Sequence, residues 1–134
     1  MRSAMQPVAA MTRPQGGHMR TKLVVHVNLE DEARLIEALA NIRNLLDEVG
    51  EDRAQVVLVA NGGVVKLLPP GKNEKAGGVV EKLKRRGVTF RVCGNALRYY
   101  EIERSDLPDA WEVVPAGIVD IAALQQDGFA YVKP

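Results

Sequence analysis

The stretch KLVVHVNLEDEARLIEALANIRNLLDEVGEDRAQVVLVA, residues 22–60, decides the fold. Its two ends, 22–28 and 54–60, are rich in valine and mostly apolar, which is typical of strands buried on both faces of a parallel sheet. Between them, apolar residues recur at steps of four and three along one helical face, namely Leu35, Leu39, Ile42, Leu46 and Val49. The stretch therefore predicts a strand, a helix and a second strand that runs parallel to the first.

The same alternation of strands and helices continues to the C-terminus. Further strands are expected at 88–93, 112–114 and 129–132, and helical segments at 64–68, 75–86, 94–101 and 118–124. No two-residue hairpin turn joins any of the strands, which favours parallel pairing, and right-handed crossovers then place helices on both faces of the sheet. We expect a three-layer α/β sandwich with a five-stranded, mainly parallel sheet of Rossmann-like or flavodoxin-like type.

Composition narrows the class of protein. With 134 residues, 46% hydrophobic and 26% charged, the chain has room for one domain with one core. Its 18 basic and 17 acidic residues leave a net charge of +1, so we expect no nucleic-acid partner. The sequence holds no apolar run long enough to span a membrane, and its single cysteine excludes an internal disulfide. The cysteine and two histidines have no zinc-ligand spacing, so we expect no metal, no cofactor and a cytoplasmic location.

The first nineteen residues differ from the rest. All four methionines lie there, and Gly16-Gly17-His18-Met19 resembles the remnant of an expression vector. We therefore predict that 1–19 is a disordered or artificial leader and that 20–134 is the folded domain.

Ligands of open parallel sheets bind beyond the carboxyl ends of the strands. The segments expected at that edge are 28–29, 61–63, 93–95 and 115–117, and three of the four contain glycine, which lets a ligand or another backbone approach closely. From this placement we predict ligand contacts from Asn61, Gly62, Gly63, Gly94, Asn95 and Gly117.

Cys93 is the most reactive type of side chain at this edge and is the candidate catalytic residue. A helix that begins at Gly94 or Asn95 would turn its free N–H groups toward the sulfur and favour the nucleophilic thiolate. The alternative is that Cys93 is a small buried hydrophobic residue, as free cysteines often are.

Three other features leave alternatives open. Residues 61–63 could cradle an anion or could form a plain strand-to-helix turn, since they lack the spacing of a phosphate-binding motif. His26 is mid-strand, which favours a hydrogen-bonded core histidine over a general base. The aromatic residues Tyr99, Tyr100 and Trp111 could belong to the core or to an interface.

The sequence resembles the DsrE/DsrF-like family, most closely its small stand-alone members. The resemblance lies in VANGGV (59–64), VTFRVCGNAL (88–97), VPAGI (114–118) and GFAYVKP (128–134), and it covers roughly residue 22 to the C-terminus. It implies a five-stranded parallel sheet with flanking helices, and assembly into homotrimers or hexamers.

In the sulfur-relay branch of that family, the DsrE and TusD type, a cysteine carries sulfur as a persulfide and passes it to a partner protein. Cys93 is the candidate for this role, because residues 93–98 partly match the cysteine segment of that branch, although the match ends at Tyr99-Tyr100. The resemblance therefore implies a sulfur carrier or sulfurtransferase-like subunit with a sulfur donor or acceptor protein. The alternative function is a non-enzymatic homo-oligomeric module that binds a small anionic ligand or nucleotide at the same edge.

Overall fold

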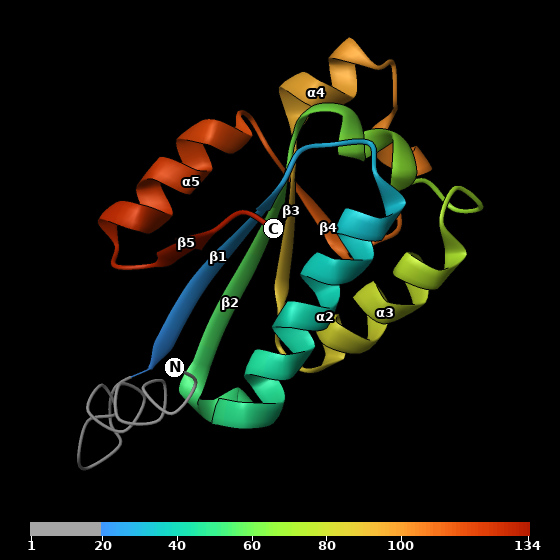
Figure 1. Cartoon of the computed structure of the whole chain (residues 1–134). Helices are drawn as coiled ribbons and strands as arrows, with labels where there is room; N and C mark the ends of the chain where they lie inside the picture. Colours follow the sequence, from blue (N-terminus) through green and yellow to red (C-terminus); the bar gives the residue numbers. More distant parts are fainter. Residues whose placement is uncertain (1–19) are drawn as a thin grey trace, which may run out of the picture.

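The structure is a computed structural model, and it describes residues 20–134. The predicted leader at 1–19 lies outside the described residues. Five strands form one sheet in the order β4-β3-β2-β1-β5, and their bounds are β1 (Thr21–Val27), β2 (Ala54–Ala60), β3 (Thr89–Cys93), β4 (Trp111–Val114) and β5 (Ala130–Val132). Every neighbouring pair is parallel, which confirms the predicted fold class (Figure 1).

The helices lie close to where the sequence predicts them: α2 (Glu32–Val49), α3 (Glu74–Arg85), α4 (Gly94–Tyr99) and α5 (Gly117–Gln126). Asp31 is the N-cap of α2, and its side chain accepts the backbone N–H of Arg34 at 3.1 Å. The short helix predicted at 64–68 is a 3₁₀ helix, η3 (Gly62–Leu67). Shorter 3₁₀ turns, η2 (Glu51–Arg53) and η4 (Arg104–Asp106), precede β2 and β4.

The helices divide unequally between the two faces of the sheet. On one side, α2 and α3 pack over the strands and form the larger hydrophobic cluster, whose centre includes Leu39, Leu58 and Phe90. On the other side α5 packs alone, through Ile121, on a smaller cluster (Figure 1). The strand order explains the difference, because the first three crossovers run one way along the sheet and the last returns from β4 to the opposite edge.

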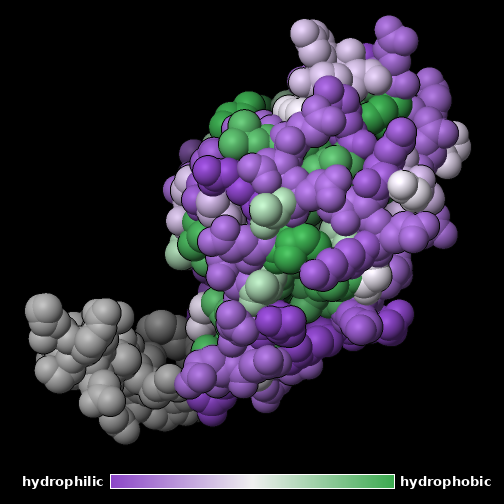
Figure 2. Space-filling view, turned by 45° about the vertical axis from the view of Figure 1, so that its right-hand side comes forward, coloured by the Kyte–Doolittle hydropathy of each residue, from purple (hydrophilic) through white to green (hydrophobic). Residues whose placement is uncertain are grey.

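The outer surface around α2 and α3 is mainly hydrophilic. Figure 2 shows hydrophobic side chains there in small separate patches among charged and polar ones. Within residues 20–134, no helix combines the length and the apolar character that a membrane crossing requires.

Gly77, the fourth residue of α3, is a position where a side chain can be added without a steric clash. Nothing lies within 4 Å of the place that its Cβ would occupy, and its backbone has no positive φ. Gly77→Ala should therefore raise the free energy of unfolding by about 0.5–1 kcal/mol, because glycine inside a helix is disfavoured by that amount. Urea unfolding followed by circular dichroism measures the change.

Gly87→Ala is the matched control. It also has open space around its Cβ position, but its φ is +98°, so alanine there should lower stability. Equal changes in the free energy of unfolding in Gly77→Ala and Gly87→Ala would contradict this prediction.

Candidate functional site

Three of the predicted site residues meet at the C-terminal edge of the sheet. A Cβ placed on Gly117 would lie 3.2 Å from the Cβ of Asn61 and 3.2 Å from the Cβ of Cys93. The last crossover has to pass over the ends of β3 and β2 on its way from β4 to β5, and glycine gives it room to do so. Asn61 and Cys93 therefore flank the first residue of α5. The sequence predicted that the three residues share one edge of the sheet, but not that they are in contact.

Cys93 ends β3 and caps the next helix. Its sulfur accepts the backbone N–H of Ala96 at 3.4 Å, in the position that a serine or asparagine oxygen usually takes at a helix N-cap. The predicted N–H donor thus faces the sulfur. The residue is only 6% exposed and belongs to the larger hydrophobic cluster, so it also has the burial of a core cysteine.

A hydrogen-bonded chain of three side chains lies on the α5 side of the sheet. His26, in β1, has its Nε2 2.7 Å from Oδ1 of Asn61 and its Nδ1 2.6 Å from the hydroxyl of Tyr131. His26 is the one buried polar or charged side chain in the core of residues 20–134. Both ring nitrogens have partners, which confirms the interpretation of His26 as a hydrogen-bonded core histidine.

The roles in this chain follow from the atoms. An amide oxygen can only accept, so Nε2 of His26 donates its N–H to Asn61. The hydroxyl of Tyr131, which can both donate and accept, lies 2.6 Å from Nδ1 on the other side of the ring. The sequence did not predict a role for Tyr131 here, because only the pairing of β5 with β1 brings it next to His26.

The other predicted ligand residues are Gly62, Gly63, Gly94 and Asn95, and the glycines among them lie at close backbone contacts. Gly62 has a φ of +68° and its Cβ would lie 2.8 Å from the carbonyl oxygen of Asn28, so no larger residue fits. Gly63 lies against Glu30, and a Cβ on Gly94 would come within 3.2 Å of the carbonyl oxygen of Val114. Residues 61–63 thus form a tight strand-to-helix turn, and their contact with an anion stays a prediction.

Asn95 is exposed, and its side-chain oxygen accepts a hydrogen bond from Arg98. It therefore lies on the outside of α4 and not beside Asn61 and Gly117.

Ion pairs hold the elements around this edge. Lys66 of η3 lies 2.7 Å from Glu30 and 4.9 Å above the ring of Tyr100. The hydrogen bond to Glu30 raises the pKa of Lys66, which therefore keeps its charge. Arg91 of β3 donates to both carboxylate oxygens of Asp120 at 3.0 and 3.2 Å and so ties α5 to the sheet.

Exposed apolar side chains surround the same edge. Tyr99 of α4 is 79% exposed, and Ile118 and Val119 at the start of α5 are 62% and 65% exposed. Trp111, in contrast, is 2% exposed and packs edge-on against Phe90, with ring centroids 5.3 Å apart. Of the two interpretations of Trp111, the core residue is correct, because alternation along β4 turns it toward the larger cluster.

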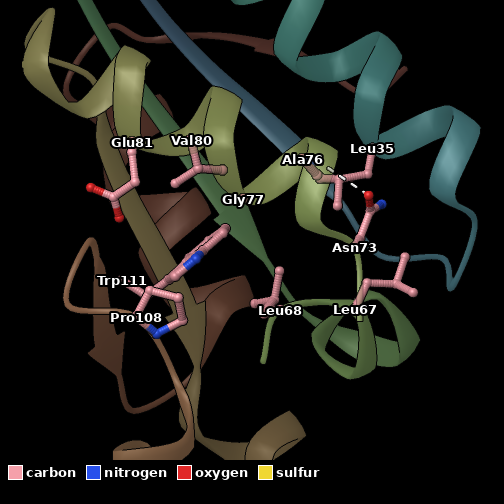
Figure 3. Close-up of a pocket in the computed structure, with 10 residues that line it drawn as sticks. All are labelled: Leu35, Leu67, Leu68, Asn73, Ala76, Gly77, Val80, Glu81, Pro108 and Trp111. Carbon is pink, nitrogen blue, oxygen red and sulfur yellow. Dashed lines mark hydrogen bonds between the residues drawn. The ribbon is translucent and has the colours of Figure 1, made fainter. Parts of the chain in front are cut away.

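A separate apolar pocket lies on the α2 and α3 side of the molecule. Figure 3 shows Trp111, Val80 and Leu68 converging on it, while Asn73 uses its oxygen to accept the N–H of Ala76. The cavity measures about 20 Å³, which is room for one water molecule. It contains none of the predicted site residues.

No group of three His, Cys, Asp or Glu side chains in residues 20–134 is arranged to hold a metal ion. The side chains that lie at or near the strand ends are the thiol of Cys93, the amide of Asn61 and the imidazole of His26.

The parallel sandwich with one cysteine at a strand end defines a small α/β protein of the flavodoxin-like and Rossmann-like class. The DsrE/DsrF-like family model matches residues 23–134, and the chain belongs to this family. This confirms the resemblance seen in the sequence.

Two solved structures share the fold. A protein of unknown function from Methanobacterium thermoautotrophicum, MTH1491, is 31% identical, with a TM-score of 0.78 over 85% of this chain and 99% of that chain. The ychN protein from E. coli is 18% identical, with a TM-score of 0.65 over 85% of this chain and 100% of that chain. A search of curated proteins found no match.

Proposed function

We propose that the protein is a sulfur carrier in which Cys93 holds a sulfur atom as a persulfide. The observation that carries the proposal is the hydrogen bond from the N–H of Ala96 to the Cys93 sulfur at the end of β3. A donor aimed at sulfur stabilises its anionic form, and both a thiolate and a persulfide anion need that stabilisation. Membership of the DsrE/DsrF-like family supports the same role.

The proposed reaction is thiol exchange. The Cys93 thiolate attacks the outer sulfur of a donor persulfide, R–S–SH, the bond between the two donor sulfurs breaks, and the donor leaves as the thiolate R–S⁻. Cys93 then carries –S–SH, and an acceptor thiolate removes the outer sulfur by the same exchange. The sulfane sulfur changes carrier without an external oxidant or reductant, so the sulfurtransferase-like step requires no cofactor. A reducing cytoplasm, the compartment we propose, keeps the resting thiol available.

Burial sets the accessibility of this thiol. Since Cys93 is only 6% exposed, a donor protein reaches the sulfur only when the chain that covers it opens locally. Loading should therefore be slower than for an exposed cysteine peptide.

We further propose that the partners are other copies of the same chain, in a trimer or hexamer, together with a sulfur donor or acceptor protein. α5 supports self-association because four of its apolar side chains are exposed, namely those of Ile118, Val119, Ala122 and Ala123. A helix that is apolar on nearly all sides is typical of one buried between subunits. The net charge of +1 gives nucleic acid little to bind.

The test of the carrier function is intact mass spectrometry after incubation with glutathione persulfide. The protein should gain the mass of one sulfur atom, a reducing agent should remove it, and Cys93→Ser should gain nothing. Because the chain has one cysteine, no other thiol can supply the signal. A wild-type protein that gains no sulfur would contradict the carrier function.

The burial of Cys93 favours a second candidate, a non-enzymatic module that binds a small anionic ligand or nucleotide at the same edge. The cap residue Ala116 offers no side-chain acceptor to the first N–H groups of α5, which leaves them available to an anion. A thermal-shift series with phosphate, AMP and ADP separates the candidates. Stabilisation that persists in Cys93→Ala supports the binding module, and no stabilisation by any of them argues against it.

A further inference from the structure

We propose that α5 is a lid over Cys93, which the ion pair of Arg91 and Asp120 holds closed and which opens while the rest of the sheet stays folded. The inference rests on the proposed function of Cys93, because it names the chain that moves before a sulfur donor reaches the buried thiol. It gives a role to an ion pair that thiol exchange itself does not use.

The start of α5 lies directly on Cys93. A Cβ placed on Gly117, the first residue of the helix, would lie 3.2 Å from the Cβ of Cys93. Cys93 and Arg91 are two residues apart in β3, so their side chains leave the sheet on the same face, the one that α5 covers. Lifting this end of α5 therefore uncovers the thiol on that face.

The apolar packing of α5 is weak for its length. The helix lies alone on its face of the sheet (Figure 1), and Ile121 is the one side chain that it buries. α3, which is of similar length, buries the side chains of three residues on the other face. Elements with few buried contacts open at a lower free energy than the global unfolding of the protein.

The C-terminal end of α5 is fastened to β1. Lys22 donates a hydrogen bond to the carbonyl oxygen of Asp127, the C-cap residue, and its ammonium group lies 3.6 Å from the carboxylate of Asp127. The next strand, β5, is joined to β1 by backbone pairing and by the contact of Tyr131 with His26. This end of the helix is therefore the pivot.

The N-terminal end of α5 depends on one polar contact. Its cap residue, Ala116, makes no side-chain hydrogen bond to the first turn. Within residues 20–134, the pair of Arg91 and Asp120 is the one side-chain hydrogen bond or ion pair that joins helix residues 117–126 to the sheet. The two side chains are 29% and 16% exposed, so water screens the pair less than it screens one on the open surface. This pair is the latch of the proposed lid.

Three substitutions test the latch while leaving Cys93 in place. Asp120→Asn removes one charge of the pair at constant size, and Arg91→Met removes the other and keeps an apolar stem. Glu51→Gln is the control, because it removes the carboxylate that accepts from Arg86 at 2.8 Å, next to the start of β2 at the opposite edge of the sheet.

The readout is the rate at which Cys93 reacts with the aromatic disulfide DTNB, at several urea concentrations below the unfolding transition. Cys93 is the only thiol of the chain, so the released aromatic thiolate reports on it alone. Asp120→Asn should raise the rate about tenfold, the effect of losing one charge-assisted hydrogen bond, and Glu51→Gln should leave the rate unchanged. Combining Asp120→Asn with Arg91→Met should give no faster reaction than the faster single variant, because both remove the same interaction.

The urea dependence separates opening of the lid from complete unfolding. We expect the logarithm of the wild-type rate to rise with urea less than half as steeply as the global unfolding constant does, because a lid exposes little surface. Equal slopes would overturn the proposal, and so would equal rates in Asp120→Asn and Glu51→Gln. All variants are compared at one protein concentration, since association through the exposed side of α5 would add to the forces that hold it closed.

Hydrogen exchange followed by mass spectrometry identifies the helix that moves. In the wild type, peptides from 117–126 should exchange faster than peptides from 32–49 in α2. Asp120→Asn should accelerate exchange in 117–126 and leave 94–99 in α4 unchanged. A variant that accelerates exchange in α4 and not in α5 would overturn the proposal.

The DTNB and exchange measurements need no sulfur donor. If glutathione persulfide fails to load the wild type but the DTNB rate still depends on Asp120, the carrier function fails and the lid stands. If loading succeeds and the DTNB rate does not depend on Asp120, only the lid fails.

Discussion

Gly117→Ala should lower the free energy of unfolding by about 1–3 kcal/mol, the usual cost of adding a methyl group to a fully packed site. The new Cβ would lie 3.2 Å from the Cβ atoms of Asn61 and Cys93 and 3.4 Å from Cγ1 of Val59. Two of these three atoms are attached directly to the backbone, so no change of rotamer can move them. The start of α5 has to shift away from the ends of β2 and β3.

Gly77→Ala is the matched control for this experiment. Both glycines lie in helices and neither has a positive φ, so the same methyl group is added to similar backbones. The sign of the stability change should differ, because one Cβ position is open and the other is filled. Urea unfolding of both variants in parallel measures it, and a stabilised Gly117→Ala variant would refute the close packing of this edge.

The same substitution should also affect the site. Moving α5 outward separates it from Asn61 and Cys93. The rate at which Cys93 gains a persulfide should therefore differ from the wild-type rate in Gly117→Ala and equal it in Gly77→Ala.

A double variant, Ile118→Lys with Val119→Lys, should dissociate the proposed homo-oligomer into single chains of 14.7 kDa. The two side chains are 62% and 65% exposed on a helix that is apolar around most of its circumference. In the proposed oligomer, burial of both side chains between subunits would supply part of the association energy, and two buried, unpaired ammonium groups would oppose it. Multi-angle light scattering should give three or six times the chain mass for the wild type.

Glu81→Lys is the control for the double variant. It makes the same change in net charge at an exposed position of α3, on the opposite face of the sheet from α5, and should leave the oligomer intact. A wild type that already has the mass of one chain would contradict the proposed self-association, and so would a double variant that keeps the wild-type mass.

Local sequence patterns determined the elements and their class. The apolar stripe from Leu35 to Val49 specified α2, and the valine-rich segments at 22–28 and 54–60 specified two central strands, because helical and extended periodicity depend only on near neighbours. The edge at which Asn61 and Cys93 lie also followed, since it is a consequence of parallel pairing alone.

Only the tertiary structure decided how that edge is built. The strand order sends the last crossover over the ends of β3 and β2, which places Gly117 between Asn61 and Cys93. The same order pairs β5 with β1 and thereby joins Tyr131 to His26, 105 residues away. The sequence likewise did not predict whether Cys93 and Trp111 are buried, because burial depends on which distant elements cover the strands. Periodicity within a segment carries no information about such long-range neighbours.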